Sequence, residues 1–138
     1  MNVLIVDDDN IKAKWSEDSL RLNQEVKDVK VVSYAEEAIQ LLEGGNIDLV
    51  VLDMQFCLSQ GNFDRLAGIF VLKEMKENPN INGDIPVVLC SSGSYLKELD
   101  NYSNIVAFLR YGHNNVDEIY EGIVRKISRD MQKNGVER

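Results

Sequence analysis

The sequence predicts an α/β fold: a five-stranded parallel sheet covered by helices on both faces, in a three-layer (βα)5 arrangement. Short apolar runs and amphipathic segments alternate five times along the 138 residues, a pattern typical of parallel strands joined by right-handed helical crossovers. Two of the runs, Val3–Val6 and Leu49–Leu52, are continuous, as expected for strands buried on both faces. Aspartate follows both at once and places their ends at the edge of the sheet. Since no linker or repeat interrupts the chain, residues 1–138 are expected to form one domain.

Capping residues divide the first half of the chain. Asn10 is expected to cap the first helix. Charged residues interrupt the second strand, within residues 26–32, and indicate that this strand lies at an edge of the sheet. Ser33 and Glu36 form a capping-box pattern, in which both side chains bond free backbone N–H groups at the start of the second helix.

The second half continues the alternation. The polar residues 55–65, after the third strand, are predicted to form a solvated loop. A third helix is expected over residues 66–78, where apolar side chains recur at helical spacing. The fourth strand, Val87–Cys90, ends on Ser91.

The last third is expected to hold a short helix over residues 94–100, a fifth strand over Ile105–Leu109, and a long helix capped by Asn115. An apolar stripe predicts that the long helix packs into the core. The stripe consists of Ile119, Ile123, Ile127 and Met131.

The strand order 2-1-3-4-5 places the most apolar strands, one, three and four, in the centre and strand two at an edge. Strands one and three are then neighbours at the switch point, where ligands bind in open α/β sheets. Asp7, Asp8 and Asp53 therefore converge. Three carboxylates at one edge repel one another unless a cation lies among them, and Mg²⁺, a hard ion with oxygen ligands, is the natural candidate. A carboxylate beside such an ion can attack phosphorus and form an aspartyl phosphate.

The charge of the chain narrows the possible partners. A net charge of −8 at pH 7 argues against a nucleic-acid-binding surface, which requires a basic patch. No apolar run approaches the ~20 residues of a membrane span and no signal peptide is evident, so a cytoplasmic protein without membrane contact is expected. Cys57 and Cys90 are expected to be free thiols, because two cysteines and one histidine make a poor metal site.

Five segments resemble the receiver domain of two-component response regulators, which has a flavodoxin-like fold. In chain order they are Leu4-Ile-Val-Asp-Asp8, Asp48-Leu-Val-Val-Leu-Asp53, Gly68-Ile-Phe-Val-Leu-Lys-Glu-Met75, Ile85-Pro-Val-Val-Leu-Cys-Ser91 and Ala107-Phe-Leu109. The resemblance covers nearly the whole chain, roughly residues 2–131. It implies phosphorelay signal transduction: a phosphoprotein that receives its phosphoryl group from a sensor histidine kinase or a phosphotransfer protein, rather than an enzyme that turns over small molecules.

The resemblance also implies a role for each acid. Asp53 is the phosphoacceptor. Asp7 and Asp8 hold Mg²⁺ together with Asp53 and the backbone carbonyl of Gln55. The register leaves open whether the acidic pair is Asp7-Asp8 or Asp8-Asp9, and the first two acids after the strand fit better.

Further positions match the family or depart from it. Ser91 takes the place of the hydroxyl that turns toward the phosphoryl group, and Phe108 that of the switch aromatic on the fifth strand. The family lysine that binds a phosphoryl oxygen is replaced by Tyr111. The adjacent Arg110 is a possible substitute for it, although strand alternation should aim Arg110 at the other face. Cys57 stands where the family usually has proline, and the loop from Asp53 to Gly68 is longer than the family's usual spacing.

Two alternatives remain open. A pseudo-receiver, an interaction module that works without phosphorylation, is favoured by the missing lysine. A small Mg²⁺-dependent phosphohydrolase with Asp53 as nucleophile is disfavoured, because Gln55 occupies the second acidic position of haloacid-dehalogenase-like enzymes. The length leaves no room for an output domain. A stand-alone receiver, monomeric or weakly dimeric, is thus expected to bind an output protein through the face of helix four, strand five and helix five.

Overall fold

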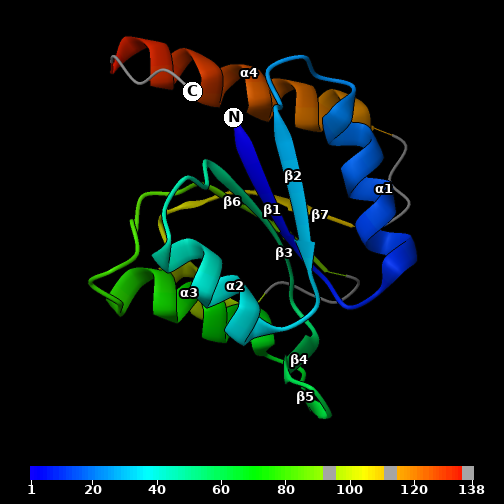
Figure 1. Cartoon of the computed structure of the whole chain (residues 1–138), viewed down its shortest axis with the longest axis vertical. Helices are drawn as coiled ribbons and strands as arrows, with labels where there is room; N and C mark the ends of the chain where they lie inside the picture. Colours follow the sequence, from blue (N-terminus) through cyan, green and yellow to red (C-terminus); the bar gives the residue numbers. More distant parts are fainter. Residues whose placement is uncertain (92–95, 111–114, 135–138) are drawn as a thin grey trace.

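The computed structural model describes residues 1–91, 96–110 and 115–134, and five strands of it form one parallel sheet (Figure 1). These strands are β1 (Asn2–Val6), β2 (Asp28–Val32), β3 (Leu49–Asp53), β6 (Val87–Cys90) and β7 (Ile105–Leu109). Their order is β2-β1-β3-β6-β7, which confirms the predicted order 2-1-3-4-5 and the edge position of the second strand. All four pairings are parallel, as the flavodoxin-like α/β prediction requires.

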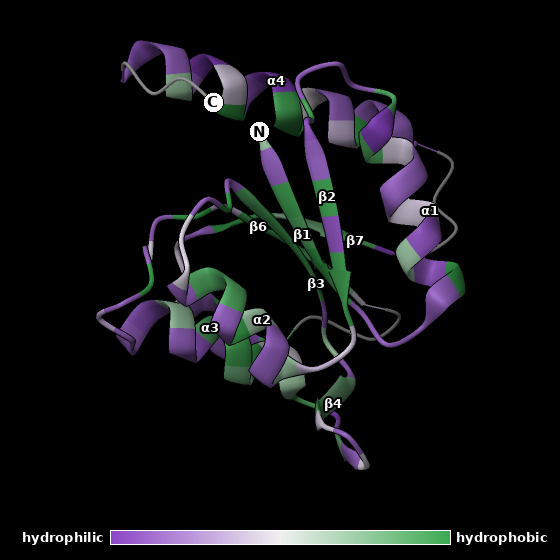
Figure 2. Cartoon of the chain, in the orientation of Figure 1, coloured by the Kyte–Doolittle hydropathy of each residue, from purple (hydrophilic) through white to green (hydrophobic). Residues whose placement is uncertain are grey.

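Helices cover the two faces of the sheet in pairs (Figure 1). On one face α1 (Asn10–Arg21) packs with α4 (Val116–Lys133), and on the other α2 (Ala35–Glu43) packs with α3 (Ala67–Glu77). A short 3₁₀ helix, η1 (Lys97–Asn101), precedes β7. Apolar residues concentrate on the strands between the two helical layers (Figure 2). Within the described part of the chain, no helix combines the length and the apolar character that a membrane span needs.

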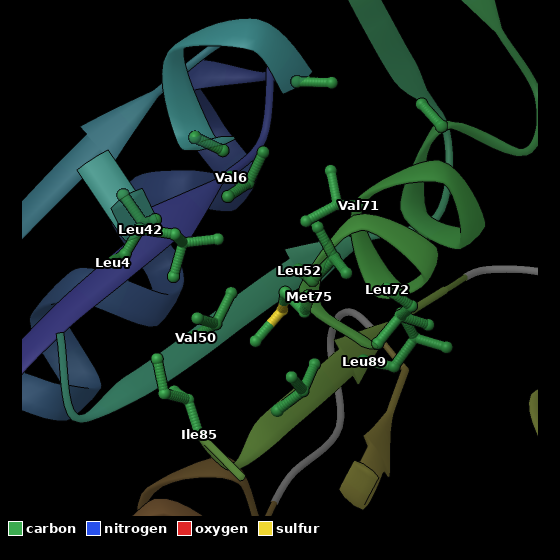
Figure 3. Packing of buried hydrophobic residues seen from close by; sticks show 14 of the residues in the cluster. Leu4, Val6, Leu42, Val50, Leu52, Val71, Leu72, Met75, Ile85 and Leu89 are labelled. Carbon is green, nitrogen blue, oxygen red and sulfur yellow. The ribbon is translucent and has the colours of Figure 1, made fainter. Parts of the chain in front are cut away.

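Two apolar clusters, one on each face of the sheet, hold the three layers together. Leu4 and Val6 belong to the cluster beneath α2 and α3 (Figure 3), whereas Val3 and Ile5 belong to the cluster beneath α1 and α4. Successive side chains of a strand point to opposite faces, so a strand between two helical layers must be apolar at every position. Every residue of β3 is buried, including Asp53 at its end.

The cap of α1 differs from the prediction by one residue. Asp9, not Asn10, is the capping residue, and its carboxylate accepts hydrogen bonds from the backbone N–H groups of Ile11 (2.9 Å) and Lys12 (3.2 Å). Both residue types cap helices well, and the helix begins as soon as the chain leaves the sheet edge. Asn10 is the first residue of the helix itself.

The predicted capping box at α2 is wrong. Tyr34, not Ser33, occupies the N-cap position, and no side chain caps the helix. Tyr34 is extended because it pairs with Cys57 in an isolated parallel bridge, so the helix starts one residue later than a box with Ser33 and Glu36 requires. At α4 the predicted N-cap position, Asn115, is right, although its side chain makes no capping hydrogen bond.

Residues 55–65 do not form the predicted solvated loop. They contain a two-stranded antiparallel hairpin of β4 (Phe56–Ser59) and β5 (Asn62–Asp64). Its base packs against α2 and α3 through β4, in which Phe56 is fully buried. The turn is tight because Gly61 adopts a φ of 77°, a conformation that glycine reaches without steric cost.

The predicted apolar stripe of α4 is only partly core. The helix is rotated so that the neighbouring positions Val116, Tyr120 and Val124 face the sheet and are buried. The Tyr120 hydroxyl reaches Ser16 of α1 at 3.0 Å, which fixes this rotation. The stripe is therefore half-buried and lines an open groove beside β7, at the amino ends of the strands. Its members there are Ile119, Ile123, Ile127 and Met131.

Candidate functional site

The segments that end β1 and β3 bring three aspartates together at the carboxyl edge of the sheet. Val6 of β1 lies opposite Leu52 of β3, so the residues that follow, Asp7 and Asp53, leave the sheet side by side. One carboxylate oxygen from each of Asp7, Asp8 and Asp53 lies within 4.8 Å of the other two. Asp7 and Asp53 are buried and Asp8 is exposed, so the cluster opens to solvent on the Asp8 side. The convergence predicted from the strand order is confirmed.

Asp9 is engaged elsewhere. Its carboxylate caps α1, and its backbone N–H donates to Asp7 Oδ1 at 2.9 Å. This hydrogen bond orients the Asp7 carboxylate within the cluster. The geometry supports Asp7 and Asp8 as the acidic pair.

Backbone groups of Met54, Cys90 and Gly68 fix the position of Asp53. The N–H of Met54 is shared between Asp53 Oδ1 (3.0 Å) and the carbonyl of Cys90 (3.1 Å). The N–H of Gly68, in the first turn of α3, donates to the carbonyl of Met54 at 3.0 Å. A Cβ atom on Gly68 would lie 2.8 Å from the carbonyl oxygen of Asp53, so only glycine lets α3 approach this closely. With 7% of its surface exposed, Asp53 is more enclosed than the end of a strand suggests.

Burial and neighbouring charge shift the pKa of Asp53. Burial first, and then the negative charge of Asp7, raise the pKa of Asp53 to about 7. Lys12 and the hydrogen bond from Met54 oppose this rise, and Asp8 adds to it. Without a cation, burial and the two neighbouring acids therefore disfavour the ionised form of Asp53, which is the form that a hard cation would stabilise.

The family model for the response regulator receiver domain matches residues 3–108. The chain belongs to this family. Solved structures agree in fold: a Francisella response regulator receiver domain has 22% identity and a TM-score of 0.70, over 94% of this chain and 98% of that one. A receiver domain protein from Methanospirillum hungatei has 19% identity and a TM-score of 0.68, over 96% and 97%. The Mn²⁺-bound form of the response regulator Rcp1 has 19% identity and a TM-score of 0.66, over 88% and 90%. No curated protein matched the sequence.

The acids of this receiver domain form a cluster typical of the family's metal site. The donor set fits a hard divalent cation, because it offers carboxylate oxygens from three residues and concentrates negative charge where one ion would relieve it. Gln55, whose carbonyl is the fourth predicted ligand, follows Met54 directly and is exposed.

The other predicted residues lie around the same edge. Ser91 directly follows Cys90, which pairs with Asp53 across the sheet, and its N–H donates to the carbonyl of Leu109 at 3.0 Å. Phe108 is half-exposed on β7. Arg110 is exposed after the end of β7. Tyr111 lies outside the described residues.

Two neighbours of the acids were not predicted. Lys12 extends from the first turn of α1 and opposes the rise in the pKa of Asp53. Its place in the first turn of the helix that directly follows Asp7 and Asp8 was a usable signal, because that turn starts at the same edge of the sheet. Cys57 Sγ lies 3.9 Å from Asp8 Oδ2. That contact depends on the hairpin, which no periodic pattern in the sequence indicated.

Proposed function

We propose that this receiver domain accepts a phosphoryl group on Asp53 from a phosphohistidine of a sensor histidine kinase or a phosphotransfer protein. The convergence of Asp53 with Asp7 and Asp8 at the carboxyl edge carries the proposal. Members of the family are phosphoacceptors rather than turnover enzymes, and membership implies a histidine kinase partner.

In the proposed step, a carboxylate oxygen of Asp53 attacks the phosphorus atom while the P–N bond to the donor imidazole breaks. The imidazole leaves with the electron pair of that bond and takes up a proton from solvent, and the product is an acyl phosphate. Asp53 must be ionised to attack, and Lys12 favours that form. Mg²⁺, held by Asp7, Asp8, Asp53 and the carbonyl of Gln55, would supply positive charge to the acceptor and to the phosphoryl oxygens.

The readout is proposed to pass through Ser91 and Phe108. Ser91 follows β6 at the edge where the phosphoryl group would sit, so its hydroxyl is the proposed hydrogen-bond donor to a phosphoryl oxygen. Phe108 is half-exposed on β7 and is the proposed aromatic whose position responds. The proposed output surface, which would bind another protein, comprises η1, β7 and α4.

The test uses acetyl phosphate, a donor that needs no partner protein. The purified chain is incubated with acetyl phosphate and Mg²⁺, and its intact mass is measured beside that of Asp53→Asn. The expected result is one phosphoryl adduct in the wild type and none in the variant. Because Asn keeps the size of the side chain and removes the nucleophilic oxygen, the comparison isolates the chemistry of the acceptor.

Two other results would contradict the proposal. A chain that forms no adduct and whose stability is unaffected by Mg²⁺ would be an interaction module that works without phosphorylation. Release of phosphate from small esters over many turnovers, lost in Asp53→Asn, would identify a hydrolase.

A further inference from the structure

The side chain of Cys57 lies at the side of the acidic cluster that opens to solvent. Cys57 belongs to β4, the first strand of the hairpin beyond the carboxyl edge of the sheet (Figure 1). Its thiol is half-buried, forms no disulfide and donates to Asp8 Oδ2 at 3.9 Å. Asp8 is the exposed member of the three-carboxylate cluster. The hairpin therefore brings a sulfur atom to the carboxylates where a cation would bind.

The neighbours of Cys57 fix its position. The preceding residue, Phe56, is fully buried in the apolar cluster beneath α2 and α3. Because successive side chains of a strand point to opposite sides, Cys57 points away from that cluster, toward Asp8. The backbone of Cys57 bridges to Tyr34 and pairs with Phe63 of β5. A donor atom on a backbone held in this way is preorganised for an ion.

The distance between the sulfur and the carboxylate fits one shared ion. Zn²⁺ binds cysteine sulfur at about 2.3 Å and carboxylate oxygen at about 2.0–2.2 Å, so at a tetrahedral angle the two atoms lie about 3.6 Å apart. Without an ion, Cys57 Sγ and Asp8 Oδ2 are 3.9 Å apart. A small rotation of the exposed Asp8 side chain closes this difference. The thiol releases its proton to solvent when the ion binds.

Sulfur and oxygen donors favour different ions. Carboxylates suit Mg²⁺ and Mn²⁺, whereas a thiolate favours Zn²⁺ and the softer Cd²⁺. Two cysteines and one histidine make a poor metal site by themselves. Cys57, however, adds its sulfur beside carboxylates that one ion can already reach together. A mixed set of sulfur and carboxylate donors is one that Zn²⁺ accepts and Mg²⁺ does not need.

We infer that Cys57 is a metal ligand, which together with Asp8 and the buried Asp7 and Asp53 makes this edge a site for a thiophilic divalent cation such as Zn²⁺. The inference rests on the part of the proposed function that places a cation at the acids, and it does not require phosphoryl transfer. The thiol strengthens the binding of Zn²⁺ and leaves that of Mg²⁺ and Mn²⁺ unchanged, because these ions prefer oxygen.

The test measures metal binding to the full chain in a phosphine reductant without added thiols. Cd²⁺ reports a bond to sulfur through the ultraviolet charge-transfer band of a cadmium thiolate. Competition with a chromophoric chelator gives the Zn²⁺ affinity, and electron paramagnetic resonance gives the Mn²⁺ affinity. Cys57→Ser replaces the sulfur by oxygen at nearly the same size and keeps Cys90, the other cysteine of the chain. Asp8→Asn keeps Cys57 and removes the charge of the acid beside it.

The wild type is expected to show the cadmium–thiolate band, and Cys57→Ser is expected to lack it. Cys57→Ser should also lose about tenfold or more of the Zn²⁺ affinity, because even groups that only support metal ligands are typically worth about 10–100-fold. Its Mn²⁺ affinity should match that of the wild type. Asp8→Asn should bind Mn²⁺ and Zn²⁺ more weakly than the wild type does.

Three results would overturn the inference while leaving the proposed function intact. The first is a wild type that binds Mn²⁺ and shows no cadmium–thiolate band. The second is a band or a Zn²⁺ affinity that Cys57→Ser retains in full, which would leave the contact with Asp8 a hydrogen bond only. The third is an unchanged band and Zn²⁺ affinity in Asp8→Asn, because Cys57 would then bind metal without the acids. A wild type that binds none of the three ions would overturn the proposed cation site, and the inference with it.

Discussion

Gly68→Ala is expected to lower the stability of the chain and to displace Asp53, the proposed phosphoryl acceptor, because α3 starts against the peptide that follows Asp53. The added Cβ would lie 2.8 Å from the carbonyl oxygen of Asp53 and 3.0 Å from the Cα of Met54. Both neighbours are backbone atoms, so neither can rotate away. Either α3 retreats from β3 or the Asp53–Met54 peptide shifts, and both movements displace the acceptor carboxylate.

Gly122→Ala is the matched control. Gly122 lies in α4, and a Cβ built on it meets no atom within 4 Å. Alanine favours a helix over glycine by about 1 kcal/mol, so Gly122→Ala should raise the free energy of unfolding by up to that amount. The same gain is offset at Gly68 by an overpacking cost of about 1–3 kcal/mol. The difference between the two variants therefore isolates the steric cost of the close approach.

Urea unfolding of both variants measures this difference, and the rate of adduct formation with acetyl phosphate reports on the acceptor. Gly68→Ala should be less stable than Gly122→Ala by about 1–3 kcal/mol. It should also be phosphorylated more slowly, while Gly122→Ala keeps the wild-type rate. If Gly68→Ala were as stable as Gly122→Ala and equally reactive, α3 would not hold the acceptor by close approach, and this reasoning would be refuted.

Three further predictions concern the acids and their neighbours. The folded state raises the pKa of Asp53 from 3.8 to about 7, so the folded chain binds the proton more tightly and its stability falls as the pH rises from about 4 to 7. Without Mg²⁺, Asp53→Asn should therefore be more stable than the wild type at pH 8 by about 1–2 kcal/mol after allowance for solvent screening, and this gap in urea unfolding should vanish near pH 4. Lys12→Met should raise the pKa of Asp53 further in a carboxyl-carbon NMR titration, whereas Lys14→Met, at an exposed lysine paired with Asp18, should leave it unchanged. Asp9→Ala should cost about 1 kcal/mol in thermal unfolding through loss of the α1 cap, and Asn10→Ala should cost much less.

The sheet was predictable because its signals are local and redundant. Buried central strands need continuous apolar runs, and the run that ends on Asp53 could only be a strand covered on both faces. The strand order then followed from which runs are most apolar, and the acidic site followed from the order. No long-range contact had to be known.

The sequence predictions were wrong where a contact between residues far apart in the chain determines the local structure. Ser33 and Glu36 satisfy a local capping rule, but the bridge between Tyr34 and Cys57 holds the chain extended and delays the helix. The hairpin lacks a clear alternating pattern, and burial of Phe56 against α2 and α3 fixes its base. Such contacts become visible only once the layers are assembled.

The Met54 N–H is shared between Asp53 and Cys90, and it connects the ends of β3, β6 and β7 through one peptide group. The carbonyl that it reaches belongs to the peptide joining Cys90 to Ser91, and the N–H of that same peptide donates to Leu109 at the end of β7. A planar amide turns as one body, so tilting its carbonyl also tilts its N–H. If a group bound to Asp53 Oδ1 displaced the Met54 N–H, this N–H would bond the Cys90 carbonyl alone. The plane of the Cys90–Ser91 peptide would then reorient, and its hydrogen bond would shift Leu109, the residue after Phe108. Backbone hydrogen bonds therefore connect Asp53 to the end of β7 through the Cys90–Ser91 peptide, with no side chain involved other than that of Asp53.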